Sequence, residues 1–377
     1  MTEEIPSTNG QLGKLGIIAM RGCEELADKI DRYLLEWRAC EGRKTFRIDT
    51  ECQRFSDGQG KGVVRESVRG HDIYIVCDVL NYGVTFKMYG VEIPMSPDNH
   101  FQDLKRVIAA IGGKARRITV IMPYLYESRQ DSKKMRESLN CALALQELIR
   151  MGVSNIIVFD AHETRVQNAI PLSGFDNVLP HYQMLKALVR NVPDVLLDED
   201  SSMIVAPDEG AMERCMKYTS VLKLNLGMFY KIRDHSRIVD GKNPILEHTF
   251  LGGDVEGKDV IIVDDILASG QSLLEVAKQL KERGARRIFA FATFGLFSEG
   301  MDVFDKAYKD GWFERIFTTN LIYRNPSLKS REWYVEVDMS KFISLIIDTL
   351  NQDISIRLLL NPEDKIIKLL ANRGQSK

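Results

Sequence analysis

The chain has 377 residues, 44% of them hydrophobic, which suffices for a substantial core and favours two domains over one. Its 51 basic and 53 acidic residues leave a formal charge of −2, so no strong bulk field favours nucleic acid or an anionic membrane as a partner. No apolar run approaches the roughly 20 residues that span a bilayer, and the first residues lack a secretory signal pattern. The six cysteines are scattered without a CxxC pair, which favours reduced structural thiols. We therefore expect a cytoplasmic protein whose phosphate-binding sites, if any, are local.

Residues 1–13 are polar and rich in turn formers, and we expect a flexible terminus there. From Leu15 onward, short aliphatic or β-branched runs alternate with longer amphipathic stretches. The runs predicted as strands lie within 16–20, 116–124, 155–162, 203–208, 259–265 and 286–295, and the predicted helices lie within 23–37, 136–152, 211–224 and 271–284. Runs that are apolar at successive positions are typical of parallel strands covered on both faces, so the sequence predicts an α/β fold.

Two segments suggest an internal duplication. Residues 114–124 (KARRITVIMPY) and 284–294 (GARRIFAFATF) both place a basic turn before a buried strand, and their shared isoleucines, Ile118 and Ile288, are 170 positions apart. Two similar α/β halves would follow. Chance recurrence of a short basic turn before a strand is the alternative, and this pattern alone does not decide between them.

Two adjacent carboxylates, Asp264 and Asp265, end the apolar run VIIVDD and precede the small-residue turn ASGQS and a predicted helix. In open parallel sheets, ligands gather beyond the carboxyl ends of strands, where the next helix offers free backbone N–H groups to an anion. Ser269 and Ser272 have hydroxyl donors, and Gly270 permits close backbone approach, which suits a phosphate monoester. The two acids would then face sugar hydroxyls or a divalent cation, with a solvated acidic turn as the plain alternative.

This segment resembles the signature for phosphoribosyl pyrophosphate (PRPP) that type I phosphoribosyltransferases share with ribose-phosphate pyrophosphokinases. The first group consumes PRPP, whereas the second makes it from ATP and ribose 5-phosphate. By this resemblance Asp264 and Asp265 hold the ribose hydroxyls. The implied 5-phosphate loop consists of Ala268, Ser269, Gly270, Gln271 and Ser272.

Further stretches resemble the pyrophosphokinases alone. RFSDGQ at residues 54–59 is similar to the family's adenine-binding segment, often completed across a subunit boundary, and it implies ATP contacts for Phe55, Asp57 and Gln59. The family has glutamate where this chain has Gln59, which retains an acceptor but removes a charge. SRQD at residues 128–131 resembles a second nucleotide-binding stretch and implies that Arg129 and Gln130 contact ATP, since an arginine can bind phosphate bidentately.

The remaining three motifs concern metal and charge. DAH at residues 160–162 and APD at residues 206–208 resemble family motifs that imply His162 as an ATP and metal contact and Asp208 as a second metal ligand, with Mg²⁺ as the cofactor. YKIR at residues 230–233 resembles the family's mobile catalytic loop, which implies that Lys231 and Arg233 stabilise the developing charge. Alone, YKIR is equally compatible with a solvated basic loop, and a lone histidine is more often a surface or core residue than a ligand.

The resemblance implies a divergent bacterial-type ribose-phosphate pyrophosphokinase with two duplicated type I phosphoribosyltransferase domains, each a mostly parallel sheet flanked by helices. We expect a flexible segment 1–13, an ATP-side domain 14–164, a ribose 5-phosphate-side domain 165–340, and a C-terminal helical segment 341–377 that packs back on the first domain. The expected reaction transfers pyrophosphate from ATP to the 1-hydroxyl of ribose 5-phosphate. A homo-oligomer, hexameric or smaller, is also implied.

Several departures from the family keep two alternatives open. Ala268 replaces an acid that many members carry, Phe294 replaces a histidine, and residues 78–101 are longer than the usual connection, which suggests a subunit-contact or regulatory hairpin. A phosphoribosyltransferase would use the same acidic loop but has no evident use for Arg129, His162 or Lys231. A catalytically weak regulatory homologue is the other alternative.

Overall fold

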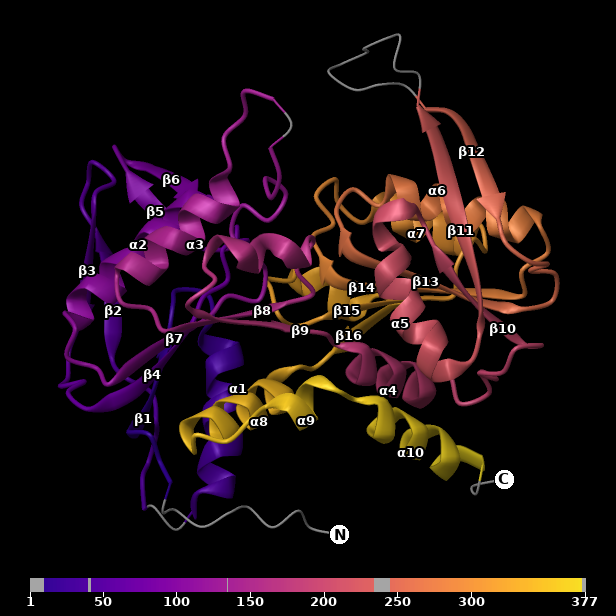
Figure 1. The fold of residues 1–377 in the computed structure, drawn as a ribbon. Helices are drawn as coiled ribbons and strands as arrows, with labels where there is room; N and C mark the ends of the chain where they lie inside the picture. Colours follow the sequence, from indigo (N-terminus) through magenta and orange to yellow (C-terminus); the bar gives the residue numbers. More distant parts are fainter. Residues whose placement is uncertain (1–9, 40–41, 134, 234–244, 375–377) are drawn as a thin grey trace. The chain divides into compact units, whose positions relative to one another are not determined.

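The computed structural model describes residues 10–39, 42–133, 135–233 and 245–374 (Figure 1). The chain divides into two compact units. Unit 1 comprises Met1–Leu179, Asn320–Tyr323 and Asp338–Asn361, and unit 2 comprises Pro180–Thr319, Arg324–Val337 and Pro362–Lys377. The domain ranges expected from the sequence stay predictions, and these units differ from them in where the first unit ends and in the return of residues 338–361 to it.

Unit 1 contains a five-stranded parallel sheet in the order β1-β4-β7-β8-β9 and two small antiparallel hairpins, β2-β3 and β5-β6. Its elements are β1 (Lys14–Ala19), α1 (Glu24–Trp37), β2 (Thr50–Arg54), β3 (Gly60–Val64), β4 (His71–Val76), β5 (Thr85–Met88), β6 (Val91–Pro94), α2 (Pro97–Ile111), β7 (Arg117–Ile121), α3 (Asn140–Arg150), β8 (Asn155–Phe159), the 3₁₀ helix η2 (Thr164–Ala169), β9 (Gly174–Val178), α8 (Ser340–Asn351) and α9 (Arg357–Leu360).

Helices cover both faces of this sheet. Figure 1 shows α2 and α3 on one face and α1 with α8 on the other. Helix α8 is fixed to α1 by polar contacts as well as packing, because Arg38 donates to Asp348 Oδ1 at 2.6 Å and to Asn351 Oδ1 at 2.8 Å. Covering both faces explains why strands such as β4 are apolar and buried at successive positions rather than at alternate ones.

Unit 2 contains a seven-stranded sheet in the order β12-β11-β10-β13-β14-β15-β16, parallel except for the edge pair β11-β12. Its elements are α4 (His181–Asn191), β10 (Ser202–Ala206), η3 (Glu209–Ala211), α5 (Met212–Leu222), β11 (Asn225–Arg233), β12 (Ile245–Leu251), β13 (Asp259–Leu267), α6 (Gln271–Glu282), β14 (Arg287–Gly295), α7 (Asp302–Lys309), β15 (Arg315–Thr319), η4 (Pro326–Ser330), β16 (Tyr334–Val337) and α10 (Glu363–Gly374).

The strand order of unit 2 reverses between β10 and β13. From β10 the chain passes through α5 to β11 on one side, and from β13 it passes through α6 to β14 on the other. Right-handed crossovers then place α5 and α6 on opposite faces, as Figure 1 shows. The carboxyl ends of β10 and β13 therefore flank a topological switch point, where open α/β sheets bind their ligands.

The predicted fold class is confirmed, since each unit is built on a mostly parallel sheet flanked by helices. Five parallel strands follow the same order in both units, with β1, β4, β7, β8 and β9 corresponding in order to β10, β13, β14, β15 and β16. Strands β7 and β14, which carry the repeated basic turn, are both third in this order. The sequence pattern that suggested duplication thus coincides with equivalent strands.

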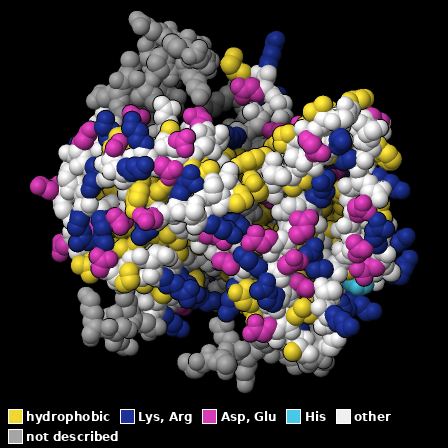
Figure 2. Space-filling model, turned by 180° about the vertical axis from the view of Figure 1, so that it is seen from behind, with side chains coloured by type: hydrophobic (Ala, Val, Ile, Leu, Met, Phe, Trp, Pro, Cys, Tyr) yellow, Lys and Arg dark blue, Asp and Glu magenta, His cyan; other side chains and the backbone are white. Residues whose placement is uncertain are grey.

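No helix among the described residues is long and apolar enough to cross a membrane. The five cysteines in this part of the chain (Cys23, Cys52, Cys77, Cys141 and Cys215) are buried and form no disulfide with one another. On the face shown in Figure 2, acidic and basic side chains are interspersed, in keeping with the nearly balanced charge of the sequence.

Candidate active site

The two adjacent carboxylates at the end of β13 have different surroundings. Successive side chains of a strand point to opposite faces, so Asp264 lines a cavity while Asp265 is 5% exposed on the other face. Asp265 forms an ion pair with Arg214 of α5, with 3.6 Å between Nη2 and Oδ2. The sequence predicted both acids as sugar ligands, but among the described residues the cavity is lined by Asp264 and not by Asp265.

Burial and the neighbouring charge of Asp265 raise the pKa of Asp264 well above its usual range, and the Arg214 guanidinium opposes this shift. In addition, the Asp265 backbone N–H donates to Asp264 Oδ1 at 2.9 Å and fixes the orientation of that carboxyl group. A ligand that supplies positive charge or hydroxyl donors at this position would favour the ionised form of Asp264.

The turn after β13 is shaped to admit an anion. Gly270 is the N-cap of α6 with φ 83°, and a β carbon there would lie 2.0 Å from Phe304 Cζ, so both the conformation and the space require glycine. The Ser269 hydroxyl accepts a hydrogen bond from the Gln271 N–H at 3.4 Å. Because the first N–H groups of a helix lack intrahelical partners, this helix start offers donors to a phosphate.

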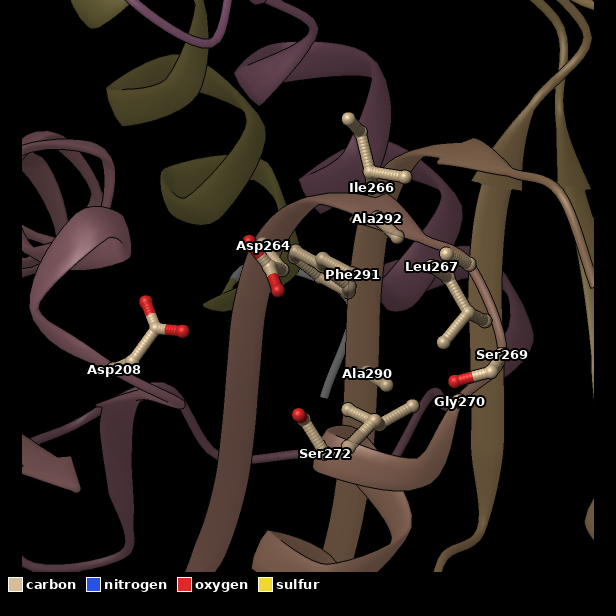
Figure 3. Close-up of a pocket in the computed structure, with 12 residues that line it drawn as sticks. Asp208, Asp264, Ile266, Leu267, Ser269, Gly270, Ser272, Ala290, Phe291 and Ala292 are labelled. Atoms are coloured by element: carbon tan, nitrogen blue, oxygen red, sulfur yellow. The ribbon is translucent and has the colours of Figure 1, made fainter. Parts of the chain in front are cut away.

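A cavity of about 140 Å³ lies at the switch point of unit 2. Figure 3 shows Asp208, which follows β10, and Asp264 on one side of it, with the Ser269 and Ser272 hydroxyls on the other. Of the predicted phosphate loop, Ala268, Ser269, Gly270 and Ser272 line this cavity, whereas Gln271 is exposed and is not among its lining residues. The cavity thus combines carboxylates with hydroxyl and backbone donors, an arrangement that suits a phosphorylated sugar.

Arg214 is a residue of this site that the sequence reasoning missed. Only 9% of it is exposed, and its pairing with Asp265 links α5 to β13. A signal was present, because the buried positions of α5 (Arg214, Cys215, Tyr218 and Leu222) follow helical spacing, which puts a charged side chain on the apolar face. A buried arginine on such a face needs an acidic partner.

In unit 1 the predicted adenine segment forms the turn between β2 and β3. Phe55 is 54% exposed, which leaves a large aromatic face open for stacking. The Gln59 amide donates to Asp57 Oδ2 at 2.8 Å, and the Gln59 N–H donates to Asp57 Oδ1 at 3.0 Å. Gln59, which stands where the family has glutamate, therefore makes a hydrogen bond within the turn that a glutamate could not make, since a carboxylate cannot donate to Asp57.

Arg129, Gln130 and His162 lie on segments that leave two neighbouring strands, β7 and β8, at the same edge of the sheet. Arg129 and His162 are exposed, while the Gln130 backbone is fixed by its N–H, which donates to Glu127 O at 2.9 Å. The structure brings these two motifs to one sheet edge. Phe55 lies on a separate hairpin of the same unit.

Lys231 and Arg233 lie in β11, which pairs with β12 so that Lys231 is opposite His248 and Arg233 is opposite Ile245. Their side chains lie outside the described residues. Among the residues that the structure describes, no three or more His, Cys, Asp or Glu side chains form a group that could hold a metal ion. The predicted metal ligands His162 and Asp208 belong to different units.

The fold of unit 2 and the glycine-containing turn after β13 are those of a phosphoribosyltransferase-type domain, and residues 175–316 match the model of the phosphoribosyl transferase domain. Residues 15–152 match the model of the N-terminal domain of ribose phosphate pyrophosphokinase. A ribose-phosphate pyrophosphokinase from Mycoplasma pneumoniae is 30% identical over 277 residues, which cover 71% of this chain and 74% of the relative. The chain belongs to the ribose-phosphate pyrophosphokinase family.

Two further comparisons extend the likeness along most of the chain. A ribose-phosphate pyrophosphokinase from Vibrio cholerae is 26% identical over 320 residues, covering 83% of this chain and 91% of the relative. The crystal structure of phosphoribosylpyrophosphate synthetase from Mycobacterium smegmatis superimposes with a TM-score of 0.71 at 22% identity, covering 90% of this chain and 99% of that chain. At that identity the superposition supports the shared fold.

Proposed function

We propose that this chain is a ribose-phosphate diphosphokinase, which transfers pyrophosphate from ATP to the 1-hydroxyl of ribose 5-phosphate and releases AMP and PRPP for nucleotide biosynthesis. Family membership supports this assignment. The observation that carries it is the cavity of unit 2, where Asp208 and Asp264 lie opposite a loop of hydroxyl and backbone donors.

On this proposal the loop holds the 5-phosphate of the sugar. Ser269 and Ser272 donate hydrogen bonds from their hydroxyl groups, and Gly270 allows the backbone to approach. Asp264 accepts hydrogen bonds from the ribose hydroxyls. Asp265, paired with Arg214, holds the end of β13 in position instead of contacting the sugar. Pyrophosphoryl transfer depends on positioning and charge neutralisation more than on covalent catalysis, and this loop would supply the positioning.

We assign the nucleotide to residues of unit 1. The exposed ring of Phe55 stacks on adenine, and the hydrogen-bonded pair Asp57 and Gln59 faces the edge of the base. Arg129, Gln130 and His162 contact the phosphates, since an exposed guanidinium binds phosphate oxygens in a bidentate manner. Lys231 and Arg233 are assigned to charge stabilisation from the family resemblance alone.

Mg²⁺ is the proposed cofactor, and the carboxylates of Asp208 and Asp264 fit it chemically because Mg²⁺ takes oxygen ligands and combines one or two carboxylates with substrate phosphates. His162 is a further proposed ligand. When bound, the ion would neutralise phosphate charge. We also propose a cytoplasmic homo-oligomer, hexameric or smaller; the buried free thiols are compatible with a reducing compartment.

The proposed reaction is tested with purified protein, Mg²⁺, ATP and ribose 5-phosphate, measuring AMP, ADP and PRPP by chromatography. AMP and PRPP should form in equal amounts. Asp264→Asn should lower turnover by about 100-fold or more, a loss of roughly 2.7 kcal/mol of transition-state stabilisation, whereas Asp200→Asn, which removes an exposed acid, should leave it unchanged. Formation of ADP, or nucleotide binding with no PRPP, would contradict the assignment and favour a regulatory homologue.

A further inference from the structure

Residues 78–101, the stretch longer than the usual family connection, contain the hairpin of β5 and β6. Met88 pairs with Val91, so only Tyr89 and Gly90 connect the strands, and both have positive φ, 48° and 83°. Two residues with positive φ form the type I′ turn that matches the twist of a hairpin. A tyrosine in this conformation is uncommon and carries some strain, which the contacts of the hairpin tip must offset.

The hairpin tip contacts the β2-β3 turn that carries Phe55 and Gln59. The Tyr89 N–H donates to Ser56 O at 2.9 Å. Met88 Sδ packs so close to Gly58 that a β carbon on Gly58 would lie 2.6 Å from it, and Gly58 itself has φ 91°. Figure 1 shows the two hairpins side by side. The conformation of this turn is therefore linked to the position of β5 and β6.

Contacts beneath the tip fix the hairpin to the body of unit 1. Phe86 is 8% exposed, and its ring lies under the Arg54 guanidinium with 5.0 Å between the ring centroid and Cζ. Arg54 also donates from Nη2 to Asp103 Oδ2 of α2 at 2.8 Å. At the other end, Arg21 Nη2 donates to Thr85 O at 2.9 Å. Arg54 directly precedes Phe55, so the Arg54 side chain joins α2 and the β5-β6 hairpin to the start of the 55–59 turn.

From these contacts we infer that the β5-β6 hairpin positions the nucleotide-binding turn 55–59, with Met88 and the Tyr89 backbone as positioning residues. This inference rests on the proposed function of that turn. A two-stranded hairpin alone is marginally stable, and its tip would lose conformational freedom on binding a base. A second hairpin that holds the tip removes part of that entropy cost before the nucleotide arrives. The hairpin acts through the turn and does not itself contact the reacting atoms.

The test removes the Met88 contact and compares the two substrates. Met88→Ala should raise the KM for ATP about three- to tenfold, with kcat and the KM for ribose 5-phosphate unchanged within about twofold. Met88→Leu, which refills the space, should restore the KM for ATP. Lys87→Ala is the matched control, because Lys87 is the adjacent residue, is exposed, and points to the opposite face of β5.

Two readouts are independent of turnover. Binding of α,β-methylene ATP with Mg²⁺ should weaken by the same factor in Met88→Ala, and amide hydrogen exchange within residues 55–59 should accelerate in that variant alone. If the wild-type protein makes no PRPP, the proposed function fails, but these two measurements still decide the role of the hairpin. Unchanged ATP binding and exchange in Met88→Ala would overturn the inference, as would an equal weakening for both substrates.

Discussion

A strand exposes alternate side chains to opposite faces, and this explains the different environments of Asp264 and Asp265 at the end of β13. Asp264 faces the cavity, and burial together with Asp265 raises its pKa. Asp265 pairs with Arg214 and so keeps a counter-charge behind the cavity wall. Arg214 thus affects the cavity without lining it, because its positive charge favours the ionised form of Asp264.

The pH dependence of activity should report this coupling. If Asp264 binds the sugar as a carboxylate, kcat/KM for ribose 5-phosphate falls as the pH drops through its raised pKa. Arg214→Gln removes a charge that lowers this pKa. The acidic limb of the pH profile of kcat/KM should therefore move to higher pH, with a loss of activity at neutral pH.

Lys217→Gln provides the control for this experiment, since it removes a more exposed cation from the same helix. Its acidic limb should coincide with that of the wild-type protein. An acidic limb that does not move in Arg214→Gln would show that Asp264 does not control this titration. Thermal unfolding of both variants separates a shifted titration from partial loss of the fold, since breaking a buried pair is itself destabilising.

Part of the cavity lining could be identified from the sequence because some of its residues are contiguous. Asp264, Ser269, Gly270 and Ser272 belong to one strand, turn and helix start, and these four line the cavity. The pairing of Arg214 with Asp265 joins two elements about 50 residues apart along the chain, and no single sequence states which buried charges meet. The assignments to ribose 5-phosphate, ATP, Mg²⁺ and the developing charge stay predictions.

At the scale of single elements, the start of α4 contains a buried histidine in an apolar environment. His181 is 7% exposed, and its ring lies 4.3 Å from that of Tyr218 on α5, centroid to centroid. Its Nε2 has no hydrogen-bond partner among the described residues. Burial lowers the pKa of His181 to about 3, with smaller contributions from Lys217 and Arg214. The packing of α4 on α5 therefore depends on a neutral imidazole.

Acid should lower the free energy of unfolding even at pH values where His181 is still neutral in the native protein. The folded pKa is about 3 and the usual value is 6.5, so between these values the unfolded chain binds one more proton than the native one. The free energy of unfolding should thus fall by at most about 1.4 kcal/mol per pH unit as the pH drops below 6.5. Urea unfolding of the wild-type protein and of His181→Phe at pH 7 and pH 5 measures this difference.

His181→Phe keeps an aromatic ring against Tyr218 and removes the titration, so its stability should depend less on pH over this range. His162→Gln removes an exposed imidazole and should retain the acid sensitivity of the wild-type protein. Equal slopes for the wild-type protein and His181→Phe would show that other groups account for the effect of acid.

The sequence predicted strongly periodic elements better than the contacts between short ones. The predicted helix 271–284 contains α6, and the strand 286–295 contains β14 almost to the residue. Strand β4 is as apolar as β7 but was not among the predicted strands, because the preceding polar segment obscures its start. The extra length of residues 78–101 was evident, whereas their contact with the 55–59 turn depends on tertiary packing.

At the scale of the whole molecule, the repeated basic turn has a structural explanation in both units. In unit 1 Arg117 of β7 donates two hydrogen bonds of 2.7 Å to Asp72 at the start of β4. In unit 2 Arg287 of β14, together with Arg286, donates to Asp259 at the start of β13. Both acids are fully buried. The duplication has thus kept a buried carboxylate paired across equivalent strands.

These pairs should stabilise their own units separately. Asp72→Asn and Asp259→Asn each remove the buried carboxylate that accepts hydrogen bonds from partly exposed arginines, and the loss of these charged hydrogen bonds should cost about 1.5–3 kcal/mol. Amide hydrogen exchange should therefore accelerate in β4 and β7 for the first variant and in β13 and β14 for the second. Asp310→Asn, at an exposed position, should change neither. If either variant accelerated exchange equally in both sheets, the units would unfold as one cooperative body, and the duplication would have left no independent folding unit.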